Sequence, residues 1–253
     1  MRFRRSDYVD TPHGNSFVWR YMNDWKFRRL IGDKALFFPN ASKLTDEYEV
    51  TIPERVMKAK RLQLRDEGLT GRDLKEELAA FFYQANPMKD LVLVNCWSAR
   101  PDESYALWKI YLGGEKNGVA VRTTVSNLRT VIENGEDFFP EEFFLGKVRY
   151  RKHLKLDDIA RLTVITTKKP YYDFEHELRA FILNYPKSEG GYQTPYDISL
   201  GRNVRVDVQG LFQRIYISPF SDPNYRQEVE NFVASKLGNS AKQLVFRSEI
   251  RDQ

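Results

Sequence analysis

Apolar and polar positions along this chain are organised around one stretch near its middle. Residues 91–94 form a continuous apolar run, which is typical of a strand buried on both faces. Cys96, Trp97 and Ser98 follow directly, so the chain becomes polar and aromatic where this strand ends. The pattern therefore predicts a buried strand whose C-terminal end carries side chains suited to binding a ligand.

The residues that follow predict a short helix with an aromatic stripe. Tyr105, Trp108 and Tyr111 recur at intervals of three, so we expect them to share one helix face. A glycine-rich turn ends this helix, and residues 119–122 then alternate as in a strand. These aromatic residues fit a packed core, which is the commoner case, or a cleft wall that holds a flat, charged ring.

The rest of the chain predicts further strands and helices, with no repeat and no low-complexity linker, so one α+β domain over residues 1–253 is the simplest arrangement. We expect a loose basic arm over 1–16, a helical insertion over 54–87 and a loop insertion over 184–203. The other expected strands are 17–22, 35–38, 145–151, 175–183, 204–208, 214–217 and 243–246, and the other expected helices are 23–31, 54–66, 72–85, 126–133, 156–167 and 222–237.

Composition limits the class of protein. A hydrophobic content of 42% with 14% aromatic residues indicates a folded globular chain. The single cysteine, Cys96, excludes an internal disulfide, and no Cys/His cluster has metal-site spacing. No apolar segment is long enough to span a bilayer and the N-terminus does not resemble a secretory signal, so we expect a cytoplasmic protein with no membrane contact. The net charge of +5 mildly favours an anionic partner.

The most unusual charged site is the pair Glu175 and Glu177. On a strand the two carboxylates share one face about 7 Å apart, twice the rise per residue. Like charges this close are unfavourable unless a cation or a substrate uses them. A solvated face in which Arg179 offsets Glu177 is one interpretation. The other is a cleft wall that stabilises positive charge developing on a sugar, as in glycosyl transfer.

Arg20, near the end of the first expected strand, is the second candidate. Its guanidinium has the geometry to hold a phosphate or a ribose, although a surface arginine is the commoner case. A tyrosine ring can stack on the positively charged nicotinamide of an oxidised cofactor. The candidate cofactor-binding residues are Arg20, Tyr21, Ser98, Tyr105, Trp108 and Tyr111.

A basic stripe is the third candidate. Lys147, Arg149 and Arg151 alternate along an expected strand, with Tyr150 between them, and such a stripe can contact the backbone of a nucleic acid. Lys152 and Lys155 follow it, and the basic helix expected at 54–66 is a candidate to extend the same surface. Stripes of this kind are more often solvated surface. No phosphate-binding loop, dinucleotide fingerprint or zinc-protease motif is present, and nothing in the sequence marks Cys96 as a nucleophile.

Three blocks of the sequence, VNCWS…ESYALWKIY…NGVAVRTT, KKPYYDFEHELR and IYISPFSDPNYRQEVENFV, resemble an uncharacterised bacterial family known as domain of unknown function 2971. Their order and spacing fit that family, and together they cover about half of the chain. That family often carries an Asn-Asp-Pro-Phe-Glu box after its second strand. Here residues 44–49 read LTDEYE, so the role of the box in this chain is open.

The order of the candidate residues is also similar to that of the ADP-ribosyltransferase superfamily, including toxin and phage-defence members. This resemblance implies a mixed, split sheet with peripheral helices and NAD as the substrate. It implies that Arg20 holds NAD with Ser98 nearby, that Tyr105 or Tyr111 packs on nicotinamide, that Glu177 is catalytic and that Glu175 orients the acceptor.

On this resemblance we expect an ADP-ribosyltransferase that uses no metal and modifies RNA or a protein, as a toxin or defence effector with an antitoxin as a further partner. The alternatives are a non-catalytic module that binds nucleic acid or a protein, or a nuclease or NAD glycohydrolase that uses the same carboxylates.

Overall fold

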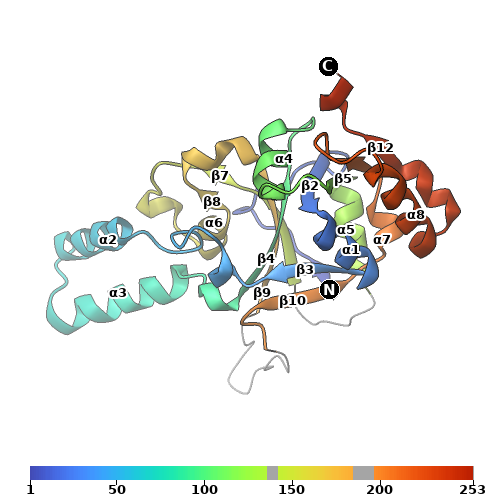
Figure 1. Cartoon of the computed structure of the whole chain (residues 1–253). Helices are drawn as coiled ribbons and strands as arrows, with labels where there is room; N and C mark the ends of the chain where they lie inside the picture. Colours follow the sequence, from blue (N-terminus) through green and yellow to red (C-terminus); the bar gives the residue numbers. More distant parts are fainter. Residues whose placement is uncertain (136–141, 185–196, 253) are drawn as a thin grey trace.

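The centre of the fold is a mixed eight-stranded sheet (Figure 1). The computed structural model describes residues 1–135, 142–184 and 197–252. The edge pairs β1–β6 and β11–β12 are parallel and the inner pairs are antiparallel. In spatial order the strands are β1 (Arg2–Phe3), β6 (Glu142–Lys147), β9 (Glu177–Leu183), β4 (Val92–Ser98), β2 (Phe17–Asn23), β5 (Gly118–Thr124), β11 (Arg214–Ile217) and β12 (Val245–Arg247).

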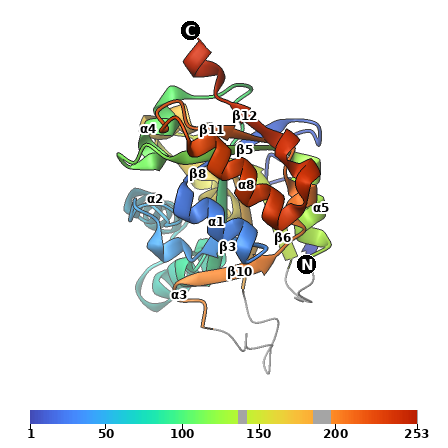
Figure 2. The same cartoon turned by 45° about the vertical axis from the view of Figure 1, so that its right-hand side comes forward.

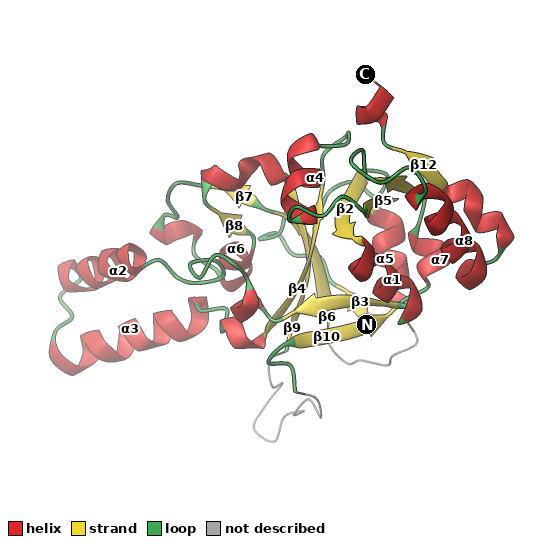
Figure 3. Cartoon of the chain, in the orientation of Figure 1, coloured by secondary structure: helices red, strands yellow, loops and turns green. Residues whose placement is uncertain are grey.

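The sheet opens between β2 and β4. β2 pairs with β5 along its whole length, and β4 does the same with β9. By contrast, β2 and β4 are joined at a single position, Trp19 opposite Ser98. A two-stranded ribbon of β3 (Ala35–Pro39) and β10 (Gly201–Arg205) crosses below the sheet (Figure 3). The amide of Asn95 on β4 donates to the carbonyl of Phe37 on this ribbon at 2.8 Å.

Four helices gather at the end of the sheet that carries β5 and β11 (Figures 1 and 2). They are α1 (Asp24–Gly32), α5 (Val125–Glu133), α7 (Val208–Leu211) and α8 (Tyr225–Leu237). Their apolar faces pack on the sheet through residues such as Phe27, Leu128 and Val229, all fully buried. α4 (Tyr105–Leu112) packs separately, with Trp108 edge-on to Tyr21 of β2 and in one buried cluster with Trp19. β2 therefore has packed neighbours on both of its faces.

A helical hairpin of α2 (Glu54–Asp66) and α3 (Gly71–Ala85) projects from the opposite end (Figure 1). Its base packs on a small layer formed by β7 (Arg149–Tyr150), β8 (Thr167–Lys168) and α6 (Arg161–Ile165). Val56 of α2 is buried there against Leu154 and Val164. The expected helices at 54–66 and 72–85 are confirmed. In the described ranges, none of the helices has the length and apolar character required to cross a bilayer.

Three expectations about the connections need correction. The segment 1–16 is not loose, because Arg2–Phe3 pairs with β6 and Val9 is buried. The expected loop at 184–203 ends in a strand, since Gly201–Arg205 pairs with β3; residues 185–196 lie outside the described ranges. The expected strand at 145–151 is divided between β6 and β7, which belong to different sheets.

Candidate functional site

A pocket of about 410 Å³ lies where β2 and β4 separate. β2 contributes Arg20, the end of β4 contributes Ser98, and the start of β9 contributes Glu177. These three strands are neighbours in the sheet, so residues distant in the sequence meet at one place. Its polar and aromatic lining includes Arg20, Trp97, Ser98, Tyr111, Glu175 and Glu177.

Glu177 is the best-anchored acid of the pocket. Its side chain is 4% exposed and forms a two-pronged ion pair with Arg179, with Nε–Oε1 and Nη2–Oε2 distances of 2.8 and 3.1 Å. Its backbone N–H donates to the Tyr150 hydroxyl at 2.8 Å. Arg179 is fully buried and also donates to the carbonyl of Ile165. The carboxylate of Glu177 is therefore held in one orientation.

Glu177 belongs to a buried ionic cluster that also contains Glu49. Arg179 bonds to the Glu49 carboxylate, and Lys168 lies 3.0 Å from Glu49, 2.8 Å from Glu175 and 3.6 Å from Glu177. We call these five residues, Glu49, Lys168, Glu175, Glu177 and Arg179, the ionic cluster. With all five ionised it contains three negative and two positive charges. The cluster therefore has one excess negative charge at the pocket wall.

The two pocket carboxylates differ in their pKa. Burial by itself raises the pKa of Glu177, but the charges of Arg179 and Lys168 outweigh this effect and lower the pKa from 4.5 to about 2. Burial raises the pKa of Glu175, and the hydrogen bond from Lys168 only partly offsets it. Two carboxylates whose pKa values are pushed apart are suited to different roles. Glu177 stays ionised, whereas Glu175 is better suited to exchange a proton.

The backbone at His176 explains how Glu175 reaches the pocket. The sequence pattern predicts Glu175 on the same strand as Glu177, which is wrong: β9 begins at Glu177, and Glu175 ends the 3₁₀ helix Pro170–Glu175. His176 between them has a left-handed conformation with φ of 44°, in which histidine is enriched among non-glycine residues. Both carboxylates nevertheless bond to Lys168 and line the same pocket.

Arg20 supplies a cation without a counter-ion. No ion pair or hydrogen bond joins its guanidinium to the described part of the chain, and its Cζ lies 5.7 Å from the centroid of the Trp97 ring. Burial lowers the pKa of Arg20, but arginine keeps its charge in proteins. An unpaired, partly buried guanidinium that lines a pocket is suited to hold an anion.

The aromatic helix contributes less to the pocket than its spacing predicts. Tyr111 lines the pocket and is stacked on Tyr21 with a ring-centroid distance of 6.4 Å. Trp108 is fully buried and donates to Glu103, and Tyr105 packs against Phe220 outside the pocket. The expectation that the three aromatic residues share a face is therefore wrong. Tyr111, not Tyr105, is available to pack on a ligand.

Ser98 and Cys96 flank the carboxylates from β4. The Ser98 hydroxyl donates to the backbone carbonyl of Glu175 at 2.7 Å, so Ser98 fixes the turn that presents Glu175. Burial and the neighbouring Glu177 charge raise the pKa of the Cys96 thiol well above its usual value. A thiol in this environment stays protonated and is a poor nucleophile.

The expected nucleic-acid residues 147–151 do not form a continuous stripe. Lys147 is exposed at the end of β6, whereas Arg149 begins β7. Arg151 pairs with Asp158 at 2.6 Å, and Tyr150 accepts a hydrogen bond from the backbone N–H of Glu177.

Within residues 1–135, 142–184 and 197–252, no group of three or more His, Cys, Asp or Glu side chains is arranged to hold a metal ion.

Glu49 and Lys168 are functional candidates that the sequence pattern missed. Glu49 ends the LTDEYE segment, and it lies 130 positions before its partner Arg179. The position of the box after the second strand is the signal that could have identified it. Lys168 begins the KKPYYDFEHELR block, and the sequence pattern assigned it no role of its own among the basic residues.

The chain matches no protein-family model, no curated protein and no solved structure.

The lowered pKa of Glu177 gives a testable pH dependence. A carboxyl with a folded-state pKa of about 2 and an ordinary value of 4.5 adds stability above about pH 4.5, which is lost as the pH falls toward 2. Glu175 contributes with the opposite sign because its pKa is raised. We expect the free energy of unfolding of Glu177→Gln to fall less steeply than that of the wild type between pH 4.5 and 2. Urea unfolding at several pH values measures the difference, and parallel pH curves would contradict it.

Proposed function

We propose that this protein is an NAD-dependent ADP-ribosyltransferase whose reaction takes place in the pocket between β2 and β4. The observation that carries the proposal is that Arg20, Ser98 and Glu177 line one pocket from three adjacent strands. These are the residues that the resemblance to the ADP-ribosyltransferase superfamily singles out. The sheet that opens between β2 and β4 agrees with the split sheet that this resemblance implies.

The ionic cluster is suited to stabilise the cation that forms in such a reaction. As the bond between nicotinamide and ribose breaks, its electron pair leaves with nicotinamide and the ribose becomes oxocarbenium-like. Glu177, held ionised by Arg179 and Lys168, supplies a fixed negative charge at the pocket wall. Because the cluster has one excess negative charge, it favours a cationic transition state over a neutral ligand.

Glu175 is suited to activate the acceptor. Its raised pKa makes it a better base than Glu177, and it lies in the same pocket. In the proposed reaction the acceptor nucleophile attacks the anomeric carbon of the ribose and its proton passes to Glu175. If water were the acceptor, the same residues would act as an NAD glycohydrolase, so separation of the labelled products distinguishes the two activities.

Arg20 and Tyr111 are suited to bind the dinucleotide. Arg20 offers an unpaired guanidinium for the pyrophosphate, and the Tyr111 ring lies on the pocket wall for the positively charged nicotinamide. The position of Arg20 beside Trp97 limits its movement, so little freedom is lost when an anion binds.

Calorimetric titration with NAD tests the cofactor. We expect wild-type protein to bind NAD and Arg20→Met to bind about ten times more weakly or worse, because a hydrogen bond to a charged group contributes roughly 1.5–3 kcal/mol. Arg247→Met, which removes an exposed arginine from β12, is the matched control and should bind like the wild type. Absence of NAD binding by the wild type would refute the proposal. Equal affinity in the two variants would refute the role of Arg20.

A further inference from the structure

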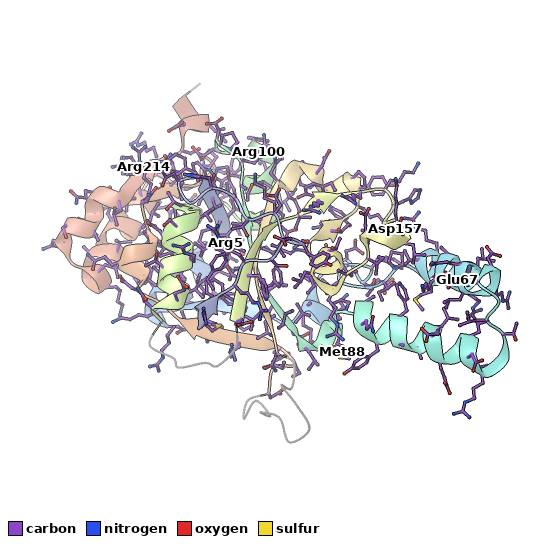
Figure 4. All side chains as sticks on the ribbon, turned by 180° about the vertical axis from the view of Figure 1, so that it is seen from behind. Arg5, Glu67, Met88, Arg100, Asp157 and Arg214 are labelled. Carbon is purple, nitrogen blue, oxygen red and sulfur yellow. The ribbon has the colours of Figure 1, made fainter. Side chains whose placement is uncertain are left out.

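A second concentration of positive charge lies outside the pocket, at the base of the helical hairpin. It is formed by Arg55 of α2, by Lys152, His153 and Lys155 in the segment after β7, and by Lys169 after β8. We call these five residues the basic patch. Figure 4 shows Asp157, a few positions beyond Lys155, on the side of the molecule where the hairpin is attached. Apart from the half-buried Arg55, the patch residues are exposed.

Packing holds the three segments of the basic patch together. The Arg55 guanidinium donates to the carbonyl of Leu154 at 3.2 Å, and the Lys169 ammonium donates to the carbonyl of Lys152 at 3.3 Å. Beneath them, Val56 and Leu154 are buried in one apolar cluster. The patch is therefore a fixed surface that requires the tertiary fold. The sequence pattern suggests Lys152, Lys155 and the helix at 54–66 as its members, but it does not identify His153, Lys169 or Tyr171.

The charges of the patch repel one another. Reduced hydration and the nearby charges of Arg55, Lys152 and Lys169 lower the pKa of His153. Within the described ranges no carboxylate forms an ion pair with Lys152, Lys155 or Lys169, whereas Arg151 nearby is neutralised by Asp158. Cations that are placed together without counter-ions favour binding of a polyanion, which releases its own counter-ions when it binds.

Aromatic residues continue from the patch toward the pocket. Lys169 is followed by the 3₁₀ helix Pro170–Glu175, whose last residue lines the pocket. On this helix the Tyr171 side chain is 79% exposed, and Tyr172 packs beside the Lys168 ammonium, 4.3 Å from the ring centroid. An exposed tyrosine next to a set of cations is the combination that binds single-stranded nucleic acid, because the bases stack on the ring while the cations contact phosphates.

We propose that the basic patch and Tyr171 bind single-stranded nucleic acid and direct it along Pro170–Glu175 toward the pocket. The binding surface is independent of the NAD chemistry. Only the further step, that the bound nucleic acid is the acceptor of ADP-ribose, rests on the proposed function. This surface replaces the stripe at residues 147–151 as the nucleic-acid site.

Fluorescence anisotropy with a labelled oligouridine of about 20 nucleotides tests the surface. We expect the dissociation constant to rise steeply between about 50 and 200 mM salt, and Lys152→Glu/Lys169→Glu to weaken binding by about tenfold or more. Lys236→Glu/Lys242→Glu reverses the same number of exposed charges near the C-terminus and should change binding less than about twofold. Tyr171→Ala should weaken binding about fivefold or more.

Three results would overturn the inference. They are equal binding by the two double variants, unchanged binding by Tyr171→Ala, and competition by polyglutamate as effective as that by unlabelled oligouridine, which would indicate an acidic protein partner. Titration of the same Lys152→Glu/Lys169→Glu variant with NAD separates the two proposals, because the substituted residues lie outside the pocket proposed to bind NAD. A wild type that binds oligouridine but not NAD would refute the proposed function and leave this surface assigned.

Discussion

Replacing Glu177 with glutamine should remove most of the transfer of ADP-ribose from NAD while the protein stays folded. The wild-type ionic cluster contains three carboxylates and two cations, so loss of one negative charge leaves it neutral. The two remaining carboxylates still balance Arg179 and Lys168, so the fold is kept, but position 177 no longer supplies the negative charge that stabilises the cationic ribose. Loss of one such preorganised group lowers the rate on the order of a hundredfold or more, about 3 kcal/mol. Single-turnover transfer from labelled NAD measures this effect.

Two further variants make this result specific. Glu76→Gln removes an exposed glutamate that is paired with Arg72 on the hairpin, and it should transfer label at the wild-type rate. Glu175→Gln should lose transfer to the acceptor but keep more of the cleavage of NAD, because the charge of Glu177 remains. Wild-type transfer by Glu177→Gln would remove Glu177 from the mechanism even if NAD binding were confirmed.

Local patterns predicted two of the strands that carry the site. The strand expected at residues 17–22 is β2, and the apolar run at 91–94 lies at the start of β4. The Glu-x-Glu pair was found because its spacing is unusual for a strand. Its geometry was predicted incorrectly, since the backbone at His176 is left-handed and the strand begins only at Glu177. Backbone conformation at a single residue depends on tertiary contacts that a pattern does not contain.

The prediction that Tyr105, Trp108 and Tyr111 share one helix face was wrong for a geometric reason. Residues three positions apart on a helix are separated by about 300° of rotation, so each step drifts by about 60°. Over two steps Tyr105 and Tyr111 diverge by about 120°, which explains why one packs on Phe220 and the other lines the pocket. A spacing of three thus places neighbours together but does not keep a third residue on the same face.

The sequence predicted only part of the ionic cluster, because its members lie far apart along the chain. Arg179 was recognised as a neighbour of Glu177, but its second partner, Glu49, lies 130 positions away. Nothing in the composition of LTDEYE distinguishes Glu49 from the other acids near it. The basic patch has the same origin, since Arg55, Lys152 and Lys169 are brought together by packing of the hairpin base. Charge clusters built from distant segments require the tertiary fold.

Arg179→Met should be the most destabilising substitution in the ionic cluster. Without this guanidinium, the three carboxylates of the cluster would face Lys168 alone, and the buried carbonyl of Ile165 would lose its donor. Removing one partner of a buried ion pair destabilises proteins by about 3–5 kcal/mol, because an uncompensated charge remains. Urea unfolding measures the change in the free energy of unfolding, and Arg179→Lys, which keeps the charge, should recover part of it.

Arg72→Met is the matched control for the stability measurement. It breaks a helical ion pair with Glu76 at a distance of 2.5 Å, and both side chains of that pair are exposed. Exposed pairs contribute only about 0–1 kcal/mol. A loss in Arg179→Met no larger than that of the control would mean that the cluster does not depend on Arg179. Arg179 would then not be the residue that fixes the Glu177 carboxylate at the pocket wall, because its ion pairs with Glu49 and Glu177 would contribute no more stability than an exposed pair.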